Sequence, residues 1–174
     1  MAKYSVSLNF IIPKKIVAKL KKIKILGNVE FDWRNSSFCH CTIKEIYSGN
    51  KLPKDLYLYS KIAEDILSKQ KSFKVTIKNL AKFSNVVYVE VYSKELIKLH
   101  KKLSKVLPSV NPNYENESFL PHISLVVSSN VTILSKLKQD FGKFEVKEIP
   151  LKISNLKNRN NPKIFAKYLL TETS

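Results

Sequence analysis

A strand, a helix and a second strand that carries a histidine follow one another twice along this chain. The first set begins near Tyr4 and reaches His40, and the second begins near Val86 and reaches His122. Tyr4 and Val86 are as far apart in the sequence as His40 and His122. Equal spacing of like elements indicates an internal duplication. Such a duplication predicts two similar lobes related by a pseudo-twofold axis, with the two histidines facing each other across a cleft.

Hydrophobic periodicity predicts a mixture of strands and helices. Residues 4–12 alternate between apolar and polar side chains, as a half-buried strand does, and Pro13 ends the run. Ser93 is a suitable N-cap for a helix whose leucines continue to Pro108. Further strands are expected at residues 29–33, 38–46, 73–80, 86–92, 119–127 and 144–149, with a final pair near 153 and 164–170. Helices are expected after Pro13, at 54–69 and near 132–139. Loops are expected at 34–37 and 155–162. The fold class is therefore α+β, bilobal, with two pseudo-symmetric antiparallel-sheet lobes flanked by helices and an active-site cleft between them.

The chain is strongly basic, with 31 lysines and arginines against 14 acidic residues and a formal charge of +17. A positive field attracts phosphate polyanions or anionic membrane surfaces and speeds the encounter with them. The same excess arises where an AT-rich genome or a lysine-rich thermophile biases composition, and that alternative stays open. Charge therefore suggests a partner and leaves the reaction undecided.

We expect a cytoplasmic protein without a membrane segment. No stretch approaches the roughly 20 apolar residues that span a bilayer, and the alternation of residues 4–12 is that of a strand, not of a signal peptide. Two positions separate Cys39 from Cys41, so on an extended strand the thiols lie too far apart for a relaxed disulfide. Free thiols of this kind suit a reducing compartment.

Two of the three histidines head the same short pattern, in which a hydroxyl residue follows two positions later; the patterns are HCTI at residues 40–43 and HISL at 122–125. On a strand, side chains at positions i and i+2 share a face. His40 therefore shares a face with Thr42, and His122 with Ser124, while the intervening apolar residues point into the core.

Paired imidazoles on either side of a phosphorus atom can perform concerted acid–base catalysis. The unperturbed histidine pKa, near 6.5, makes both protonation states accessible near neutral pH. One ring deprotonates water and the other protonates the departing oxygen. The hydroxyls of Thr42 and Ser124 can donate hydrogen bonds to the nonbridging phosphate oxygens as charge develops there. This scheme requires neither a metal nor another cofactor.

These motifs resemble those of the two-histidine (2H) phosphoesterase superfamily, in particular the RNA 2',3'-cyclic phosphodiesterases historically called 2'-5' RNA ligases. The resemblance covers nearly the whole chain: an early strand followed by a helix, the first motif near residue 40, and a second motif preceded by proline, PHISL at 121–125. It implies that residues 1–174 form a single 2H phosphoesterase domain made of two interleaved lobes, which hydrolyses a 2',3'-cyclic phosphate to a 2'-phosphomonoester.

The resemblance also implies residue roles. His40 is expected to be the proton donor to the leaving 3' oxygen, and His122 the proton acceptor that activates water. Ser124 replaces the commoner threonine, which keeps the hydroxyl but loses the methyl group that restricts the side-chain rotamer. Lys44-Glu45 and Val126-Val127 depart from the family pattern after each motif, and these departures bear on substrate choice more than on chemistry.

Three further residues are candidate substrate contacts. Lys44 continues the polar face of the first motif, and Tyr114 and Phe119 precede the second motif, where either could stack on a terminal base. Aromatic residues at the start of a strand more commonly pack in the core, so both interpretations remain open. His100 is expected at the surface or boundary of its helix.

The run Cys39-His40-Cys41 also invites interpretation as a zinc site. On a strand, His40 points away from both thiols, and no second cluster supplies the remaining ligands of a tetrahedral site. We therefore expect no metal, and we expect the cysteines to pack in the core as small hydrophobic residues.

The sequence supports three functional hypotheses. The first is metal-independent hydrolysis of RNA 2',3'-cyclic phosphate ends. The second, within the same enzyme class, is cleavage or ligation of 2'-5'-linked oligonucleotides. The third is a non-catalytic basic RNA-binding module. In each case the expected partners are RNA ends or small nucleotides with cyclic or 2'-5' phosphodiesters, and we expect a monomer.

Overall fold

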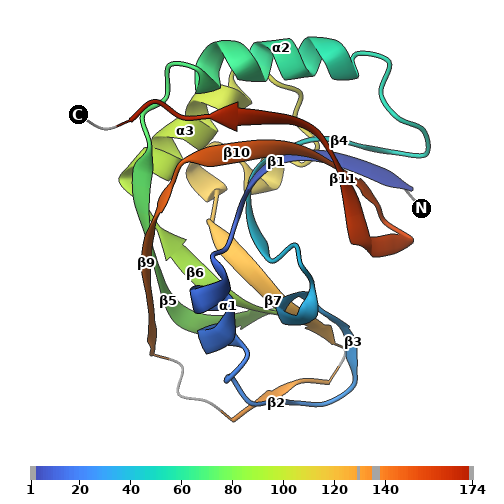
Figure 1. The fold of residues 1–174 in the computed structure, drawn as a ribbon. Coiled ribbons are helices and arrows are strands. Elements are labelled where there is room, and N and C mark those ends of the chain that lie inside the picture. Colours follow the sequence, from blue (N-terminus) through green and yellow to red (C-terminus); the bar gives the residue numbers. More distant parts are fainter. Residues whose placement is uncertain (1–2, 129, 135–137, 173–174) are drawn as a thin grey trace.

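Two antiparallel sheets form the body of the molecule (Figure 1). The computed structural model describes residues 3–128, 130–134 and 138–172. The four-stranded sheet has the order β11-β10-β1-β4, from Asn158–Leu169, Glu148–Asn155, Tyr4–Ile11 and His40–Gly49. The five-stranded sheet has the order β3-β7-β6-β5-β9, from Val29–Asp32, His122–Ser128, Val86–Tyr92, Phe73–Phe83 and Asp140–Val146. A short pair joins β2 (Ile25–Leu26) to β8 (Thr132–Ile133).

The duplicated order of elements appears as equivalent strand pairing in the two sheets. The first motif strand, β4, pairs with β1, and the second, β7, pairs with β6. Both pairings are antiparallel, so each motif strand lies beside the strand that opens its own half of the sequence. The predicted fold class, α+β with two pseudo-symmetric antiparallel-sheet lobes, is therefore confirmed.

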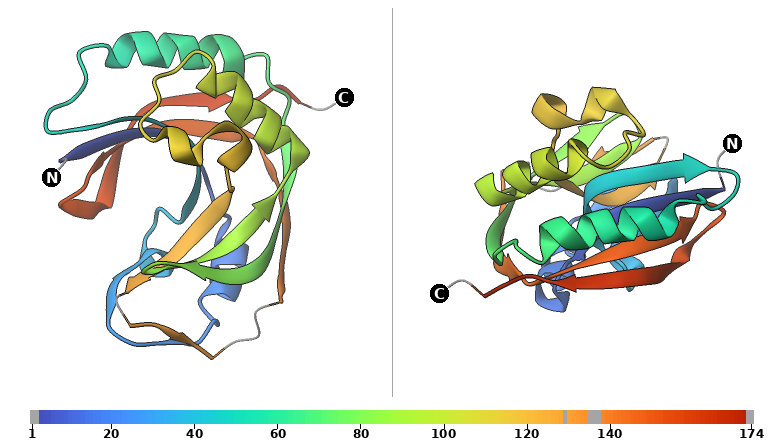
Figure 2. Two further views of the ribbon diagram at one scale, coloured as in Figure 1. Left: turned by 180° about the vertical axis from the view of Figure 1, so that it is seen from behind. Right: turned by 90° about the horizontal axis from the view of Figure 1, so that it is seen from above.

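The helix that follows the first strand of each half of the sequence packs on the sheet of the other half. Helix α1 (Lys14–Leu20) follows β1 but lies against β9, whereas α3 (Lys94–Ser104) follows β6 and lies against β4 as well as β5. The third α-helix among the described residues, α2 (Leu56–Leu67), runs along the outer side of the four-stranded sheet and contacts β11 (Figures 1 and 2). These exchanged helices tie the two lobes together.

Strand β1 is buried on both faces. Val6, Leu8 and Phe10 are almost fully buried in the core, as their alternation predicts. Ser7 and Asn9, on the other face, are also buried, at 5% and 0% exposure. Because a buried polar group needs a hydrogen-bond partner, these two side chains must be paired inside the protein.

Three expected local features differ in the structure. The loop expected at 34–37 begins one residue earlier, as a 3-10 turn over Trp33–Asn35, and it does not join two paired strands, because β3 pairs with β7. The helix expected near 132–139 is wrong at its start, where β8 pairs with β2; residues 135–137 lie outside the described part. The loop expected at 155–162 is a tight hairpin, in which Asn155 already pairs with Asn158.

Candidate active site

The two motif strands meet where the lobes adjoin. Strands β4 and β7 are in contact, and a hydrogen bond from the His122 backbone reaches the thiol of Cys41. His40 is the first residue of β4 and His122 the first of β7. Burial and the charge of Lys152 lower the pKa of His40 most, and the charge of a protonated His122 adds to this fall, so the two rings lie within electrostatic reach of each other. The predicted pair of histidines is therefore brought together.

Both imidazoles make the same backbone hydrogen bond. Nδ1 of His40 lies 2.7 Å from the carbonyl oxygen of Phe38, and Nδ1 of His122 lies 2.8 Å from that of Leu120. A carbonyl oxygen only accepts, so Nδ1 carries the hydrogen in each ring. In the neutral imidazole, Nε2 is then the nitrogen with a free lone pair, which suits it to exchange protons with a substrate.

His40 occupies the more enclosed of the two positions. The rings of Trp33 and Phe38 approach it edge-on, with centroids at 5.2 Å and 6.1 Å. Nζ of Lys152, on β10, lies 3.0 Å from its Nε2. Burial lowers the pKa of His40 to about 3, and the neighbouring Lys152 charge contributes to this fall.

His122 has aromatic neighbours and no lysine beside its ring nitrogen among the described residues. Phe83 and Tyr88 meet it edge-on, each with centroids 5.4 Å from the imidazole. Burial lowers the pKa of His122, and the hydrogen bond to the Leu120 carbonyl opposes that change. Its ring is therefore neutral near pH 7, as a proton acceptor must be.

The two hydroxyl residues of the motifs have different surroundings. Thr42 donates its hydroxyl hydrogen to Oδ1 of Asn9 at 3.0 Å, and the Asn9 amide in turn donates to the backbone oxygen of Ser7 at 2.9 Å. Ser124 is half-buried on β7, opposite Tyr88 in the register with β6. Thr42 is thus held by a buried polar network.

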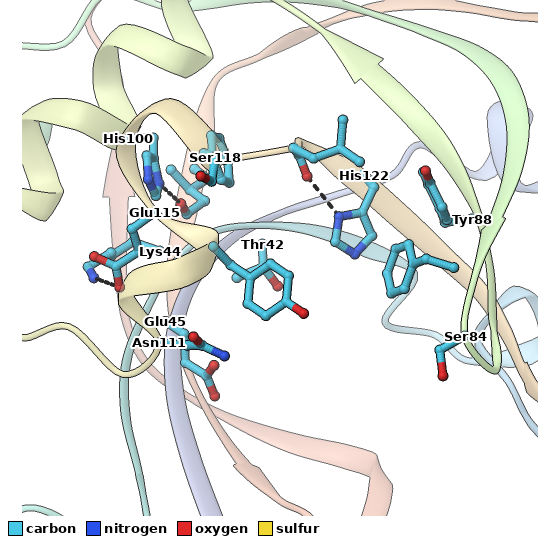
Figure 3. Close-up of a pocket in the computed structure, with 15 residues that line it drawn as sticks. Thr42, Lys44, Glu45, Ser84, Tyr88, His100, Asn111, Glu115, Ser118 and His122 are labelled. Carbon is cyan, nitrogen blue, oxygen red and sulfur yellow. Dashed lines mark hydrogen bonds and ion pairs between the residues drawn. The ribbon is translucent and has the colours of Figure 1, made fainter.

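A cleft of about 660 Å³ opens beside the motifs (Figure 3). Its walls include five of the residues singled out from the sequence: Thr42, Lys44, Tyr114, Phe119 and His122. Thr42 and His122 face a common space in Figure 3, with Glu45 and Asn111 at one end and Ser84 and Tyr88 at the other. His40 and Ser124 do not line this cleft.

The sequence profile of the family described as the 2'-5' RNA ligase superfamily matches residues 35–157, which include both motifs. The chain belongs to this superfamily. The family resemblance inferred from the motifs is therefore confirmed, and membership of the 2'-5' RNA ligase superfamily implies phosphodiester chemistry in general. A search of curated protein sequences finds no significant match to the chain.

Solved structures with the same fold include E. coli LigT complexed with 3'-AMP, with a TM-score of 0.73 and 18% identity, which covers 98% of this chain and 99% of LigT. TT0787 of Thermus thermophilus gives a TM-score of 0.72 at 15% identity, with 98% of this chain and 100% of TT0787 covered. Identities this low show a shared fold and leave the substrate undecided.

The three candidate substrate contacts differ in how free they are. Lys44, at 1% exposure, forms an ion pair with Glu115 at 2.5 Å. Phe119 stacks on His100, with ring centroids 3.7 Å apart. Tyr114 is 70% exposed, so in this member of the 2'-5' RNA ligase superfamily it is the candidate with the most surface available for a base.

The expectation that His100 lies at the surface or boundary of its helix is wrong. It is 2% exposed, its Nδ1 donates to the Ile43 carbonyl oxygen at 2.7 Å, and its Nε2 accepts from the Asn116 backbone at 3.0 Å. Burial lowers its pKa. His100 therefore joins the first motif strand, β4, to the segment around Asn116 that forms one wall of the cleft.

Sequence reasoning missed Asn9 and Lys152. Both are buried polar residues: Asn9 lies on the polar face of the alternating strand β1, where exposure was expected, and Lys152 lies between Leu151 and Ile153 of β10. A lysine between two apolar residues was the available signal for Lys152, because burying such a group without a partner is costly; the alternation of β1 offered no such signal for Asn9. Which motif residue each would reach depends on the neighbouring strands, and these are set by the tertiary fold.

The described residues contain no cluster of three or more histidine, cysteine or acidic side chains arranged to hold a metal. Cys39 and Cys41 are free thiols buried in the core, where burial raises the pKa of Cys39 to about 12. Within the described ranges, no helix combines the length and apolar character needed to cross a bilayer.

Proposed function

We propose that the chain hydrolyses RNA 2',3'-cyclic phosphate ends to 2'-phosphomonoesters, with His40 and His122 as acid and base. The observation that carries this proposal is the matched hydrogen bonding of the two rings. Each Nδ1 donates to a backbone carbonyl two residues earlier, at 2.7 Å and 2.8 Å, so Nε2 is the basic nitrogen of each neutral ring, and Nε2 of His40 accepts from Lys152. Two such nitrogens on contacting motif strands can serve as the acid and the base that displacement at phosphorus requires.

The proposed reaction begins when Nε2 of His122 takes a proton from water. The water oxygen attacks phosphorus, the bond from phosphorus to the 3' oxygen breaks, and a proton delivered through His40 completes the 3' hydroxyl. The hydroxyls of Thr42 and Ser124 stabilise the nonbridging oxygens as charge accumulates. No step needs a metal, because the imidazoles supply both the acid and the base.

The surroundings of the rings support this division of roles. Burial keeps His122 neutral, so it can accept a proton near pH 7. His40 lies beside the ammonium group of Lys152, which places the positive charge of the site on the leaving-group side. A developing negative charge on the 3' oxygen is stabilised by such a neighbour.

The expected partners are RNA ends and small nucleotides. The formal charge of +17 favours polyanions, and LigT, which shares the fold, has been solved with phosphate and with 3'-AMP. A 2'-5' phosphodiester reacts through the same kind of transition state, so 2'-5'-linked oligonucleotides are a second substrate to test.

We further propose that residues 1–174 act as one domain. We also propose that the protein is cytoplasmic, because free thiols suit a reducing compartment.

The test uses an RNA oligonucleotide with a 2',3'-cyclic phosphate end, in excess EDTA, with identification of the phosphate isomer formed. His40→Ala and His122→Ala should each lower kcat by about 10²–10⁴-fold while the protein stays folded. Lys167→Gln, at an exposed lysine of the same sheet as His40, is the matched control and should retain activity. A 2'-5'-linked oligonucleotide is assayed in parallel.

Equal turnover by both histidine variants and the wild type would reject the paired-histidine mechanism. No turnover of either substrate, combined with RNA binding that survives His40→Ala and His122→Ala, would identify a non-catalytic RNA-binding module instead. Salt dependence of binding cannot separate these outcomes, because an enzyme and a binding module use the same positive charge.

A further inference from the structure

Lys152 is a buried lysine in the middle of the four-stranded sheet. It lies on β10, pairs in register with Ser7 of β1 and Ile164 of β11, and is 4% exposed. Burying a lysine is costly unless its ammonium group finds a partner. Among the described residues, the direct partner of its Nζ is Nε2 of His40, at 3.0 Å, and the Phe38 ring lies 5.4 Å away.

The hydrogen bond that Nδ1 of His40 makes determines which atom donates between Lys152 and Nε2. Nδ1 of His40 must donate to the Phe38 carbonyl at 2.7 Å, so in the neutral ring Nε2 has no hydrogen and can only accept. Lys152 therefore donates. The nitrogen that is expected to protonate the leaving oxygen holds no proton in this state, and the nearest proton belongs to the lysine.

We propose that Lys152 and His40 act as one acid, in which the Lys152 ammonium stores the proton that Nε2 of His40 passes to the leaving oxygen. This inference rests on the proposed phosphodiesterase function and adds a positioning residue to it. Lys152 acts through His40, whereas His40 alone meets the reacting group.

The proton balance closes over one turnover. An N–H bond of Lys152 breaks as the Nε2–H bond of His40 forms, leaving a neutral amine. Because Nε2 has one hydrogen-bonding position, the amine then moves off that axis and the leaving oxygen takes its place. The Nε2–H bond then breaks as the O–H bond of the leaving alcohol forms and its bond to phosphorus breaks. The proton that His122 removed from water passes to solvent, and the amine takes up a proton from solvent to restore the ammonium.

The charges around the pair suit this exchange. Burial lowers the pKa of Lys152 to about 8, while the carboxylate of Glu45 opposes the fall. His122 faces the pair from β7, and the ion pair of Lys44 with Glu115 lies beyond Glu45. At neutral pH the lysine is therefore charged yet a stronger acid than an exposed lysine, whereas a protonated His40 would be scarce.

The proposal predicts the shape of the pH–activity profile. Activity rises as His122 loses its proton, below pH about 6.5, because burial lowers its pKa from the ordinary histidine value. Activity falls at high pH as the Lys152 ammonium ionises, near its pKa of about 8. An unassisted His40 would instead place the falling limb below the ordinary imidazole pKa, since burial lowers that pKa.

The kinetic test compares Lys152→Met, which fits the buried volume without charge, with Lys152→Arg, which keeps the charge but cannot release a proton near neutral pH. Lys152→Met should lower kcat at pH 7.5 by about 10–100-fold and move the alkaline limb down by about one pH unit or more. Lys152→Arg should lose activity and show no alkaline limb below about pH 9. Lys167→Gln, the exposed control, should keep the wild-type profile.

A second readout needs no substrate. Imidazole ¹⁵N shifts should show His40 as the neutral Nδ1–H tautomer between about pH 5 and 9 in the wild type, and the Lys152 side chain titrating near its pKa of about 8. In Lys152→Met the pKa of His40 should move up, because a positive neighbour has been removed.

The two readouts separate failure of this inference from failure of the proposed function. An active Lys152→Met with an unchanged pH profile, or an unchanged His40 titration, would overturn the shared acid while leaving the phosphodiesterase assignment intact. A wild type that hydrolyses neither substrate would overturn the proposed function, and the titration would still decide whether Lys152 and His40 share a proton. A loss of activity equal at every pH would indicate a structural role and would also overturn the proposal.

Discussion

The side-chain amide of Asn9 holds the hydroxyl group of Thr42. Oδ1 of Asn9 accepts the Thr42 hydrogen at 3.0 Å, while Nδ2 of Asn9 donates to the backbone oxygen and hydroxyl of Ser7 at 2.9 Å and 3.0 Å. A hydroxyl has one hydrogen, so Thr42 cannot donate to Asn9 and to a phosphate at the same time. Thr42 must exchange partners when substrate binds, and Asn9 fixes its orientation until then.

Removing the Asn9 amide should affect both stability and activity. Asn9→Ala removes a donor from the Ser7 carbonyl, at a residue with 5% exposure, which should cost about 1–3 kcal/mol, whereas the Thr42 hydroxyl lines the cleft and can turn to water. Urea denaturation should show this loss, and kcat/KM should fall because Thr42 is no longer oriented. Asn155→Ala, at an exposed asparagine on the same sheet, is the control. Equal stability of the two variants would contradict the prediction.

Removing the hydroxyl of Thr42 and removing that of Ser124 should have different effects on stability. Thr42→Val keeps the side-chain shape but leaves Asn9 Oδ1 with only the long hydrogen bond from the Ser7 hydroxyl, at 3.5 Å, so it should lower both the free energy of unfolding, by about 1–3 kcal/mol, and kcat. Among the described residues the Ser124 hydroxyl has no hydrogen-bond partner, so Ser124→Ala should lower kcat by about 10–10³-fold with little change in stability. Thermal unfolding and steady-state kinetics measure both quantities. A stability loss as large in Ser124→Ala as in Thr42→Val would show that the asymmetry is wrong.

Protonation of His100 should destabilise the cleft wall. Burial lowers its folded-state pKa below that of the unfolded chain, so its contribution is fully present above pH about 6.5 and is lost as the pH falls through the folded value. Protonated Nε2 can no longer accept from the Asn116 backbone, at 3.0 Å in the neutral form. Urea denaturation should therefore give a lower free energy of unfolding at pH 5 than at pH 7.5.

A substitution at His100 separates its contribution to the pH dependence of stability from the contributions of His40 and His122, whose pKa values are also lowered. His100→Phe should cost about 1–3 kcal/mol at pH 7.5, because the Ile43 carbonyl and the Asn116 amide lose their partner. The difference between pH 7.5 and pH 5 should become smaller than in the wild type. An unchanged difference would show that the pKa of His100 is the same in the folded and unfolded states, which contradicts the prediction.

Local periodicity was sufficient for most of the fold. The alternation of residues 4–12 and the N-cap at Ser93, which accepts from the Leu96 backbone at 3.3 Å, are properties of short segments and appear as predicted. The pairing of β3 with β7 was not visible, because sequence neighbours favour a hairpin and the partner lies far away in the chain. Residues 132–133 form a strand because β2 offers them a backbone partner, which overrides helical spacing.

Only the parts of the candidate site that lie on a single strand could be predicted from the sequence. His40 with Thr42, and His122 with Ser124, follow from the two-residue period of a strand. Asn9 and Lys152 reach the first motif from β1 and β10, and β10 joins β1 only through the antiparallel topology of the finished sheet. His100 was misplaced for the same reason, because its two backbone partners, in β4 and the segment before β7, are distant in sequence.

The ion pair of Lys44 with Glu115 should be strongly coupled. Their side chains are 0% and 10% exposed, and they join β4 to the segment that walls the cleft. Removing one partner leaves a buried charge unpaired, so Glu115→Gln should cost about 3–5 kcal/mol. Lys44→Met combined with Glu115→Gln removes both charges and should recover much of that loss. Urea denaturation of the wild type, the single variants and the double variant gives the coupling energy directly.

A surface pair nearby supplies the matched control for this cycle. Lys101 and Glu117 also form an ion pair, but their side chains are 39% and 87% exposed, so Glu117→Gln should cost less than about 1 kcal/mol. If Glu115→Gln were as mild, the Lys44 ammonium would have another way to be solvated, and the cleft that it lines would supply the water. Lys44 would then be available to a phosphate, and Glu115→Gln would lower KM instead of destabilising the fold.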